Sequence, residues 1–109
     1  VRPAVALLVP AHNEDAVIER TLRSLDGQIA AGDTLLVVAD NCTDETARIA
    51  RAAGAEVVER RSETLRGKGY ALDYGVTTLA DRKYDVLIIV DADCVVVEGA
   101  IDRLARCSV

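Results

Sequence analysis

Short apolar runs alternate along the chain with segments that carry polar residues. Four runs are rich in Val, Ile or Leu, and most lack polar residues at alternate positions: Ala4–Val9, Leu35–Ala39, Glu56–Val58 and Val86–Val90. Runs of this kind are typical of strands buried on both faces, as in a parallel sheet. The third run is short and is polar at both ends.

Helical patterns lie between these runs. In the first, apolar residues spaced by four, three and four positions form a single stripe, made of Ile18, Leu22, Leu25 and Ile29. Asn13, Glu14 and Asp15 precede the stripe. We expect them to cap the helix and to complement the positive end of its dipole.

Three further helices are predicted. The second covers about Thr43–Ala53, with Thr43 as its cap and Gly54 as its C-terminal stop. The third covers about Gly69–Ala80 and has one apolar face, formed by Leu72, Val76 and Leu79. The fourth covers about Glu98–Arg106. A strand followed by a helix, repeated four times, predicts an α/β fold with a mainly parallel open sheet and flanking helices.

The composition narrows the class of protein. The 109 residues suffice for a single domain, spanning residues 1–109. Phe, Trp and Met are absent, so the core must be aliphatic. The net charge of −5 makes nucleic acid an unfavourable partner. No apolar run approaches the roughly 18 residues that span a bilayer, so we expect membrane contact only through segments outside this chain.

The cysteines and the predicted sheet edge bear on location and assembly. Cys42, Cys94 and Cys107 are odd in number and unclustered, which argues against a disulfide scaffold and a zinc site. They fit a reducing compartment, and we expect a cytoplasmic protein. A sheet that ended with the fourth run would leave an exposed edge, which proteins usually cover. We therefore expect a piece of a larger protein, or a chain completed by a partner such as a second copy.

Polar segments follow the apolar runs. Open parallel sheets bind ligands outside the carboxyl ends of their strands. Four polar segments lie at or after the carboxyl ends of the predicted strands: Pro10–Glu14, Asp40–Asp44, Arg66–Gly69 and Asp91–Asp93. Turn formers and helix caps collect at every strand–helix junction, so one segment alone would carry little weight. Their convergence on one edge of the sheet predicts a binding site.

Asp91 and Asp93 form the sharpest of these motifs. Ionised carboxylates beside an apolar strand are costly unless a cation compensates them. Mg²⁺ and Mn²⁺ prefer oxygen ligands and usually bind through one or two carboxylates together with substrate phosphates. Alternate residues of an extended chain point the same way, so both carboxylates could address one ligand. The alternative is that Asp93 merely caps a turn.

Single residues of the other segments have plausible roles. Asp40 could accept hydrogen bonds from the N–H of a base, or it could cap the following helix. Lys68 lies between two glycines that would let a phosphate approach the backbone, although it could also be an ordinary solvated lysine. His12 is the only histidine. In a strand–helix turn a histidine is more often a packing or hydrogen-bonding residue than a general base.

Together these segments resemble the family 2 glycosyltransferases. The resemblance covers essentially the whole chain and implies the GT-A fold, an inverting mechanism and a nucleotide-sugar donor. Each motif is weak by itself, but the four occur in the right order and spacing. They are Pro10–Glu14, Asp40–Asp44, Gly67–Leu72 and Asp91–Asp93.

The resemblance implies a role for each matching position. Asp40 would recognise the base, commonly uracil, with Asn41 beside it. Glu14 would lie near the base and ribose, in a first wall of the nucleotide pocket formed by Pro10, Ala11, His12 and Glu14.

On the phosphate side, Lys68 would contact the base or a phosphate. Asp91, Ala92 and Asp93 match the DxD motif of the family. Its first carboxylate would lie close to the ribose, and its second would hold the Mn²⁺ or Mg²⁺ ion that bridges the diphosphate.

The resemblance also implies the reaction. An acceptor hydroxyl would attack the anomeric carbon in line, and a nucleoside diphosphate would leave. The implied partners are a UDP-sugar and an acceptor sugar or lipid-linked glycan, as in cell-wall or polysaccharide biosynthesis at the cytoplasmic face of a membrane. In the family the general base lies downstream of the DxD motif, and only sixteen residues follow Asp93. We therefore expect no catalytic residue in this chain, which would bind a donor but transfer little or no sugar alone.

Other readings of the motifs remain open at this point. Asp91–Val95 also fits the haloacid-dehalogenase phosphatases, with Asp91 as nucleophile, but there the motif opens the fold. A dinucleotide-binding domain and a sugar nucleotidyltransferase would both need a glycine-rich loop where Pro10–Glu14 has no glycine. A non-catalytic nucleotide-binding or assembly module would use the same cleft or the exposed sheet edge without turnover.

Overall fold

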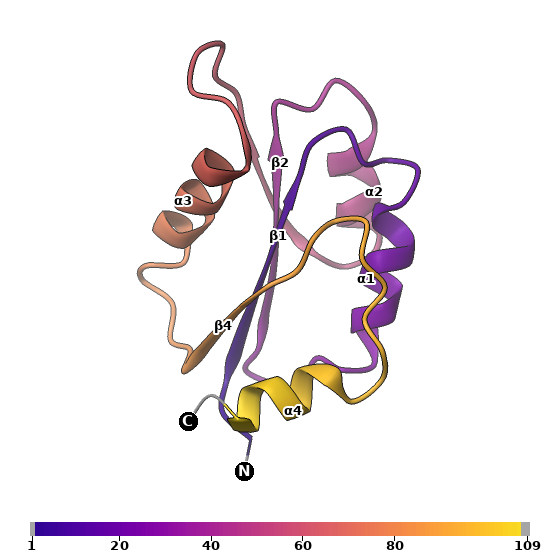
Figure 1. Ribbon diagram of the computed structural model, residues 1–109, viewed down its shortest axis with the longest axis vertical. Helices are drawn as coiled ribbons and strands as arrows, with labels where there is room; N and C mark the ends of the chain where they lie inside the picture. Colours follow the sequence, from indigo (N-terminus) through magenta and orange to yellow (C-terminus); the bar gives the residue numbers. More distant parts are fainter. Residues whose placement is uncertain (1, 108–109) are drawn as a thin grey trace.

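A computed structural model describes residues 2–107 of the chain, and Figure 1 shows its path. The strands pair in the order β3-β2-β1-β4, and every pair is parallel. The predicted α/β fold is therefore confirmed. The elements are β1 (Val5–Ala11), α1 (Ile18–Asp26), β2 (Thr34–Asp40), α2 (Thr46–Ala52), β3 (Glu56–Arg60), α3 (Lys68–Thr78), β4 (Val86–Ile89) and α4 (Ala100–Cys107).

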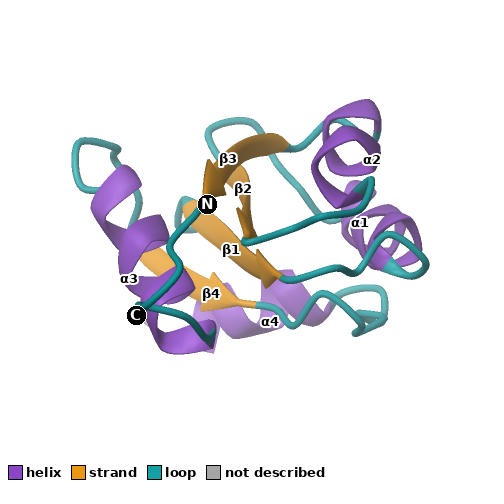
Figure 2. Ribbon diagram, turned by 90° about the horizontal axis from the view of Figure 1, so that it is seen from above, coloured by secondary structure: helices purple, strands orange, loops and turns teal. Residues whose placement is uncertain are grey.

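Helices cover the sheet unequally on its two faces. Figure 2 shows α1 and α2 on one side of the sheet and α3 on the other. Alternate residues of β1 point to opposite faces. Val5, Leu7 and Val9 pack with α1, α2 and α4, whereas Ala6 and Leu8 pack with α3. The core is aliphatic, as the composition requires. None of the described helices has the length and apolar character of a bilayer-spanning segment.

The buried face of α3 differs from the prediction. Ala71, Gly75 and Leu79 face the sheet, while Val76 is 42% exposed. A Cβ atom added to Gly75 would overlap the Leu8 side chain and lie 3.1 Å from Val38 Cγ2. Small residues therefore bring the helix close to the sheet. The predicted apolar face is correct for Leu79 and for Leu72, which packs against the same core cluster, and wrong for Val76.

The helix starts are also corrected. Helix α1 begins at Ile18 and ends at Asp26, so Ile29 lies beyond it, although Ile29 still packs against the core. No side chain caps α1, so the expected capping by residues 13–15 is wrong. Helix α2 begins at Thr46, and the carboxylate of Asp44 rather than Thr43 accepts the Thr46 N–H, at 3.0 Å.

The end of α2 follows the prediction. Gly54 has a φ of +93° and donates its N–H to the carbonyl of Arg51, while Ala55 donates to Ala50. These two bonds form a Schellman motif, which favours glycine at the left-handed position. The chain thereby reverses sharply into β3.

Strand β4 is shorter and more exposed than expected. It ends at Ile89 rather than Val90, and it pairs with β1 alone. Ile89 is 47% exposed because β4 forms an edge of the sheet. The prediction of a strand buried on both faces is wrong here, since an apolar run cannot distinguish an edge strand from a central one.

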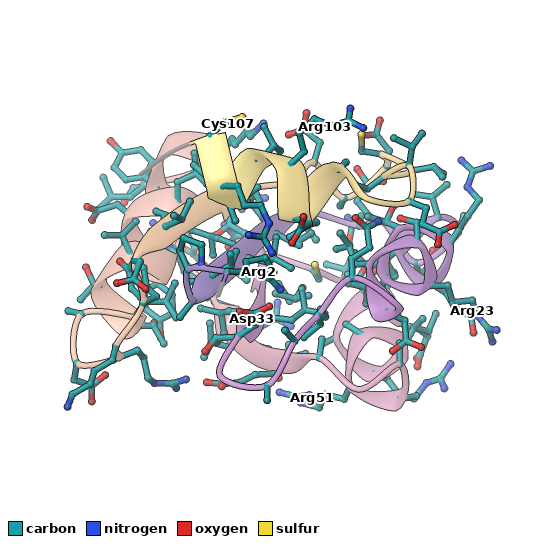
Figure 3. The ribbon with its side chains drawn as sticks, turned by 90° about the horizontal axis from the view of Figure 1, so that it is seen from below. Arg2, Arg23, Asp33, Arg51, Arg103 and Cys107 are labelled. Atoms are coloured by element: carbon teal, nitrogen blue, oxygen red, sulfur yellow. The ribbon has the colours of Figure 1, made fainter. Side chains whose placement is uncertain are left out.

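A buried ion pair closes the end of the molecule opposite the strand carboxyl ends. Arg2 binds Asp33 beside α4, as Figure 3 shows. Asp33 also accepts the N–H groups of Val5 and Ala30 at 2.9 and 2.8 Å. Burial by itself would raise the pKa of Asp33, but these hydrogen bonds and the Arg2 charge outweigh it and lower the pKa. The pair thus joins the first residues of the chain to the loop before β2.

Candidate functional site

The predicted polar segments surround a cleft at the carboxyl ends of the strands. The cleft has a volume of about 340 Å³ and is lined by Pro10, Ala11, His12, Glu14, Asp40, Lys68, Ala71, Asp91, Ala92 and Asp93. An adjoining hollow of about 410 Å³ is lined by His12, Asp40, Asn41, Arg66, Gly67 and Lys68. Every residue predicted for nucleotide or metal binding therefore lines one of two connected hollows.

A larger hollow lies elsewhere on the molecule. It measures about 590 Å³ and runs between α1 and α2, where it is lined largely by charged helix residues such as Glu19, Arg23 and Arg48. Two of these side chains neutralise each other, since Arg23 forms an ion pair with Glu19 one turn away on α1, at 2.9 Å. We assign the site to the smaller cleft because ligands of open parallel sheets bind at the strand carboxyl ends.

Two asparagines fix the loops around the cleft. Asn13 and Asn41 follow β1 and β2, and each has a φ of +50°, a left-handed conformation that asparagine tolerates better than most residues. Asn13 Oδ1 accepts the N–H of Thr43 at 2.8 Å. Asn41 Oδ1 accepts the N–H of Ser62 at 2.9 Å. Each asparagine thus binds its own loop to the loop after the neighbouring strand.

Asp44 strengthens the same junction. Its Oδ1 accepts the hydroxyl of Thr46 at 2.6 Å, and its Oδ2 accepts the N–H of Asp15 at 3.1 Å. Thr46 Oγ1 in turn accepts the N–H of Glu14 at 2.9 Å. Partial burial would raise the pKa of Asp44, but the hydrogen bonds from Thr46 and Asp15 prevail and lower it. The ionised Asp44 therefore holds the loop that presents Glu14 to the cleft.

Asp40 is the buried carboxylate of the cleft. It ends β2, is 4% exposed, and its Oδ1 accepts a hydrogen bond from Arg60 Nη1 at 2.7 Å. Arg60 also lies 5.4 Å from the centre of the Tyr70 ring and donates to the carbonyl of Leu65. The alternative that Asp40 caps α2 is not realised, since its carboxylate is engaged with β3.

Arg60 was missed by the sequence prediction, in which the third apolar run ended at Val58. It is the last residue of β3 and lies in register with Asp40. The sequence carried no clear signal for this extension, because Glu59 and Arg60 are two consecutive polar residues after Val57 and Val58.

One oxygen of Asp40 remains available to a ligand. Its hydrogen bonds with described residues are made by Oδ1, to Arg60 and to the amide of Asn41. No fully buried side-chain oxygen among the described residues lacks a partner, so Oδ2 must keep contact with solvent. The neighbouring His12 is exposed and its Nδ1 lies 2.8 Å from the Asp40 carbonyl, which requires a proton on Nδ1. This is the hydrogen-bonding role expected of a histidine in such a turn.

Asp91 and Asp93 lie in a tight turn rather than an extended strand. The N–H of Cys94 donates to the carbonyl of Asp91 at 3.0 Å, so Ala92 and Asp93 are the central residues of the turn. The argument from extended geometry is therefore wrong, because β4 has already ended. Both aspartates nevertheless line the cleft and are exposed, while Ala92 between them is buried.

A lysine faces the acidic turn. Lys68 is the first residue of α3, not a loop residue, and its Nζ forms an ion pair with Asp91. Gly67 precedes it with a φ of +116°, which a residue with a side chain rarely adopts. The first turn of α3 contains no acidic residue, so the positive end of its dipole adds to the lysine charge.

The donor set at the turn suits a hard divalent cation. The described residues contain no group of three or more His, Cys, Asp or Glu side chains arranged to hold a metal. Asp91 and Asp93 therefore offer two carboxylates at most. Mg²⁺ and Mn²⁺ accept this arrangement, because they retain water and take further oxygens from substrate phosphates.

Comparison with known proteins gives one consistent family. A family model described as "Glycosyl transferase family 2" matches residues 6–106. The 4,4'-diaponeurosporenoate glycosyltransferase of Staphylococcus aureus is 38% identical over 93 residues, which are 83% of this chain and 24% of that protein. The probable glycosyltransferase YdaM of Bacillus subtilis is 33% identical over 99 residues, covering 84% of this chain and 23% of that protein.

Solved structures give the same result. Glucosyl-3-phosphoglycerate synthase from Mycobacterium tuberculosis in complex with UDP superposes with a TM-score of 0.68 and 31% identity, over 84% of this chain and 34% of that one. The same enzyme with Mn²⁺, UDP and glucosyl-3-phosphoglycerate gives a TM-score of 0.67 and 32% identity, over 83% and 33%. The chain thus spans about a quarter to a third of the length of these proteins.

Proposed function

The chain belongs to glycosyl transferase family 2, and on this basis we propose that it is the donor-binding half of an inverting glycosyltransferase that uses a nucleotide-diphospho-sugar, with UDP-sugar as the expected donor. The observation that carries the proposal is the single cleft that gathers Asp40, Lys68, Asp91 and Asp93 from separate strand ends. Family membership also removes the phosphatase alternative, in which Asp91 would be a nucleophile.

Asp40 would bind the base. It lines the cleft, and Arg60 restrains its carboxylate through Oδ1, which leaves Oδ2 for the ligand. A fixed carboxylate accepts the imino N–H of uracil but repels the bare N3 of cytosine. The solved M. tuberculosis relative binds UDP, which supports uracil as the base.

Lys68 and the start of α3 would bind the diphosphate. In the free chain, Lys68 neutralises Asp91. A diphosphate would compete for the lysine charge and would meet the positive end of the α3 dipole. Asp93 and Asp91 would hold a Mn²⁺ or Mg²⁺ ion, which supplies charge stabilisation as the diphosphate departs. The solved relative is known with Mn²⁺ and UDP, and with Mg²⁺ and UDP.

Transfer of the sugar requires one proton acceptor beyond these residues. The acceptor hydroxyl would form a bond to the anomeric carbon, the bond to the diphosphate oxygen would break, and the hydroxyl proton would pass to a base. In our assignment the carboxylates that line the cleft bind the donor or the cation. We propose that the base and the site for an acceptor sugar or lipid-linked glycan belong to the remainder of a longer enzyme at the cytoplasmic membrane face.

Calorimetry with UDP, CDP and GDP, each with and without Mn²⁺, tests this function. We expect UDP to bind better than CDP, and Mn²⁺ to tighten its binding. Asp93→Asn should remove the Mn²⁺ effect, and Asp40→Ala should remove the preference for UDP. Asp81→Asn is the matched control, since its side chain is 88% exposed and lies outside both hollows. Equal behaviour of all three variants would refute the site.

A further inference from the structure

A row of polar residues interrupts the buried stripe of α1. Thr21, Ser24 and Gln28 are spaced by three and four positions, so they share one side of the helix and its C-terminal extension. Thr21 has no exposed surface, although it lies among the apolar residues of the stripe. A buried hydroxyl is costly unless it is hydrogen-bonded, so each partner of this row is informative.

All three residues bind the segment that follows β4. Thr21 Oγ1 donates to the carbonyl of Ala92 at 2.6 Å. Ser24 Oγ accepts the N–H of Val96 at 3.0 Å. Gln28 Oε1 accepts the N–H of Ile101 at 3.0 Å, and its Nε2 donates to the carbonyl of Val96 at 3.3 Å. Helix α1 therefore holds the irregular segment between β4 and α4 along its length.

We propose that Thr21 is a positioning residue that orients the acidic turn for the cation and the diphosphate. This inference rests on the function proposed above. Ala92 is the residue between the two aspartates, and its carbonyl belongs to the peptide bond that leads into Asp93. The Ala92 side chain packs in the core and its carbonyl accepts the Thr21 hydroxyl, so both contacts hold the turn in one orientation relative to α1.

The hydrogen bonding within the turn does not fix its orientation relative to the sheet, so the bond from Thr21 is needed for this. Within residues 91–94 the turn is closed by the backbone hydrogen bond from the Cys94 N–H to the Asp91 carbonyl. That bond closes the turn but does not set its direction relative to the sheet. The Thr21 bond does so, because it ties the turn to α1, whose apolar residues share one core cluster with Val5, Leu7 and Val9 of β1. Loss of the hydroxyl would leave the aspartates in place on average but spread over more orientations.

Thr21→Val tests the inference, because valine keeps the shape of threonine and removes the hydroxyl. Thr21→Ser is the conservative variant that keeps it. We expect Thr21→Val to reduce the Mn²⁺-dependent gain in UDP affinity about tenfold. A reduction of this size corresponds to the loss of the one hydrogen bond that orients the acidic turn. UDP affinity without metal should stay within about twofold, because Asp40 and Lys68 do not contact Thr21.

Gln28→Ala serves as the structural control. It breaks bonds to the same segment farther from the aspartates, at Val96 and Ile101. Calorimetry should show the wild-type Mn²⁺ gain for Gln28→Ala and for Thr21→Ser. Equal Mn²⁺ gains in Thr21→Val and wild type, or an equal loss in Gln28→Ala, would overturn the positioning role. So would a loss in Thr21→Ser, which decides the matter even if the valine chain does not fold. Absence of any Mn²⁺ gain in the wild-type chain would instead refute the proposed function.

Discussion

Replacing Arg60 with methionine should destabilise the chain much more than the same change at Arg61. Arg60 and Asp40 are only 11% and 6% exposed at their side chains and are joined at 2.7 Å. Removing one partner of a buried ion pair costs about 3–5 kcal/mol, because the other charge stays buried. The contact of Asp40 Oδ2 with solvent favours the lower end, so we expect a loss of about 3 kcal/mol. Arg61 is exposed, and its replacement should change stability by less than about 0.5 kcal/mol.

Urea unfolding measures this difference. With a slope of about 1.5 kcal/mol per molar, the Arg60→Met midpoint should fall by about 2 M. The double variant Asp40→Asn with Arg60→Met should be more stable than the sum of the single changes predicts, with a coupling of about 2 kcal/mol. A cost at Arg60 no larger than at Arg61, or strict additivity with Asp40→Asn, would refute the buried pair.

Three further outcomes follow from the structure. Gly75→Ala should lower stability by about 1–3 kcal/mol in thermal unfolding, because the new methyl group overlaps Leu8; an unchanged midpoint would contradict the close packing of α3. Lys68→Gln should weaken UDP binding and flatten its dependence on salt in calorimetry, and a wild-type salt dependence would remove Lys68 from the phosphate site. The folded-state pKa of Asp33 is lowered, so its contribution to stability is present above its ordinary pKa and is lost as acid titrates it in the folded chain. Asp33→Asn should therefore reduce the fall in unfolding free energy between about pH 5 and pH 2, and an unchanged pH profile would argue against the pair with Arg2.

The layout of the sheet could be predicted because it depends on features that sequence records directly. Uninterrupted apolar runs marked the strands, and the order of strands and helices fixed a parallel sheet. Its carboxyl edge then had to gather Asp40 and Asp91, whatever the details of their loops. The resemblance of four motifs to one family then indicated the chemistry expected at that edge.

Features that depend on residues far apart in the sequence packing closely in space could not be predicted from the sequence pattern. The face of α3 is set by Gly75, a residue that contributes nothing to an apolar pattern. The link between Asn13 and the loop after β2 joins residues 30 positions apart. The hydrogen bond from Thr21 to Ala92 joins residues 71 positions apart, so no local pattern in the sequence records it.

The acidic pair lines the cleft through a geometry that differs from the expected one. Extended geometry was expected to align Asp91 and Asp93, but the chain turns at these residues. Both still reach the cleft because Ala92 is buried and the flanking side chains are left outside. A pattern of acid, small residue, acid after an edge strand therefore fits a turn at least as well as a strand.

Paramagnetic broadening of amide resonances by Mn²⁺ tests the central claim most directly. With UDP present, trace Mn²⁺ should broaden the signals of residues 91–94 first and those of residues 11–14 and 67–71 next, while the same Mn²⁺ without UDP should broaden them much less. Broadening centred on the groove between α1 and α2, or broadening at the acidic turn that UDP does not change, would contradict a cation held jointly by the aspartates and a diphosphate.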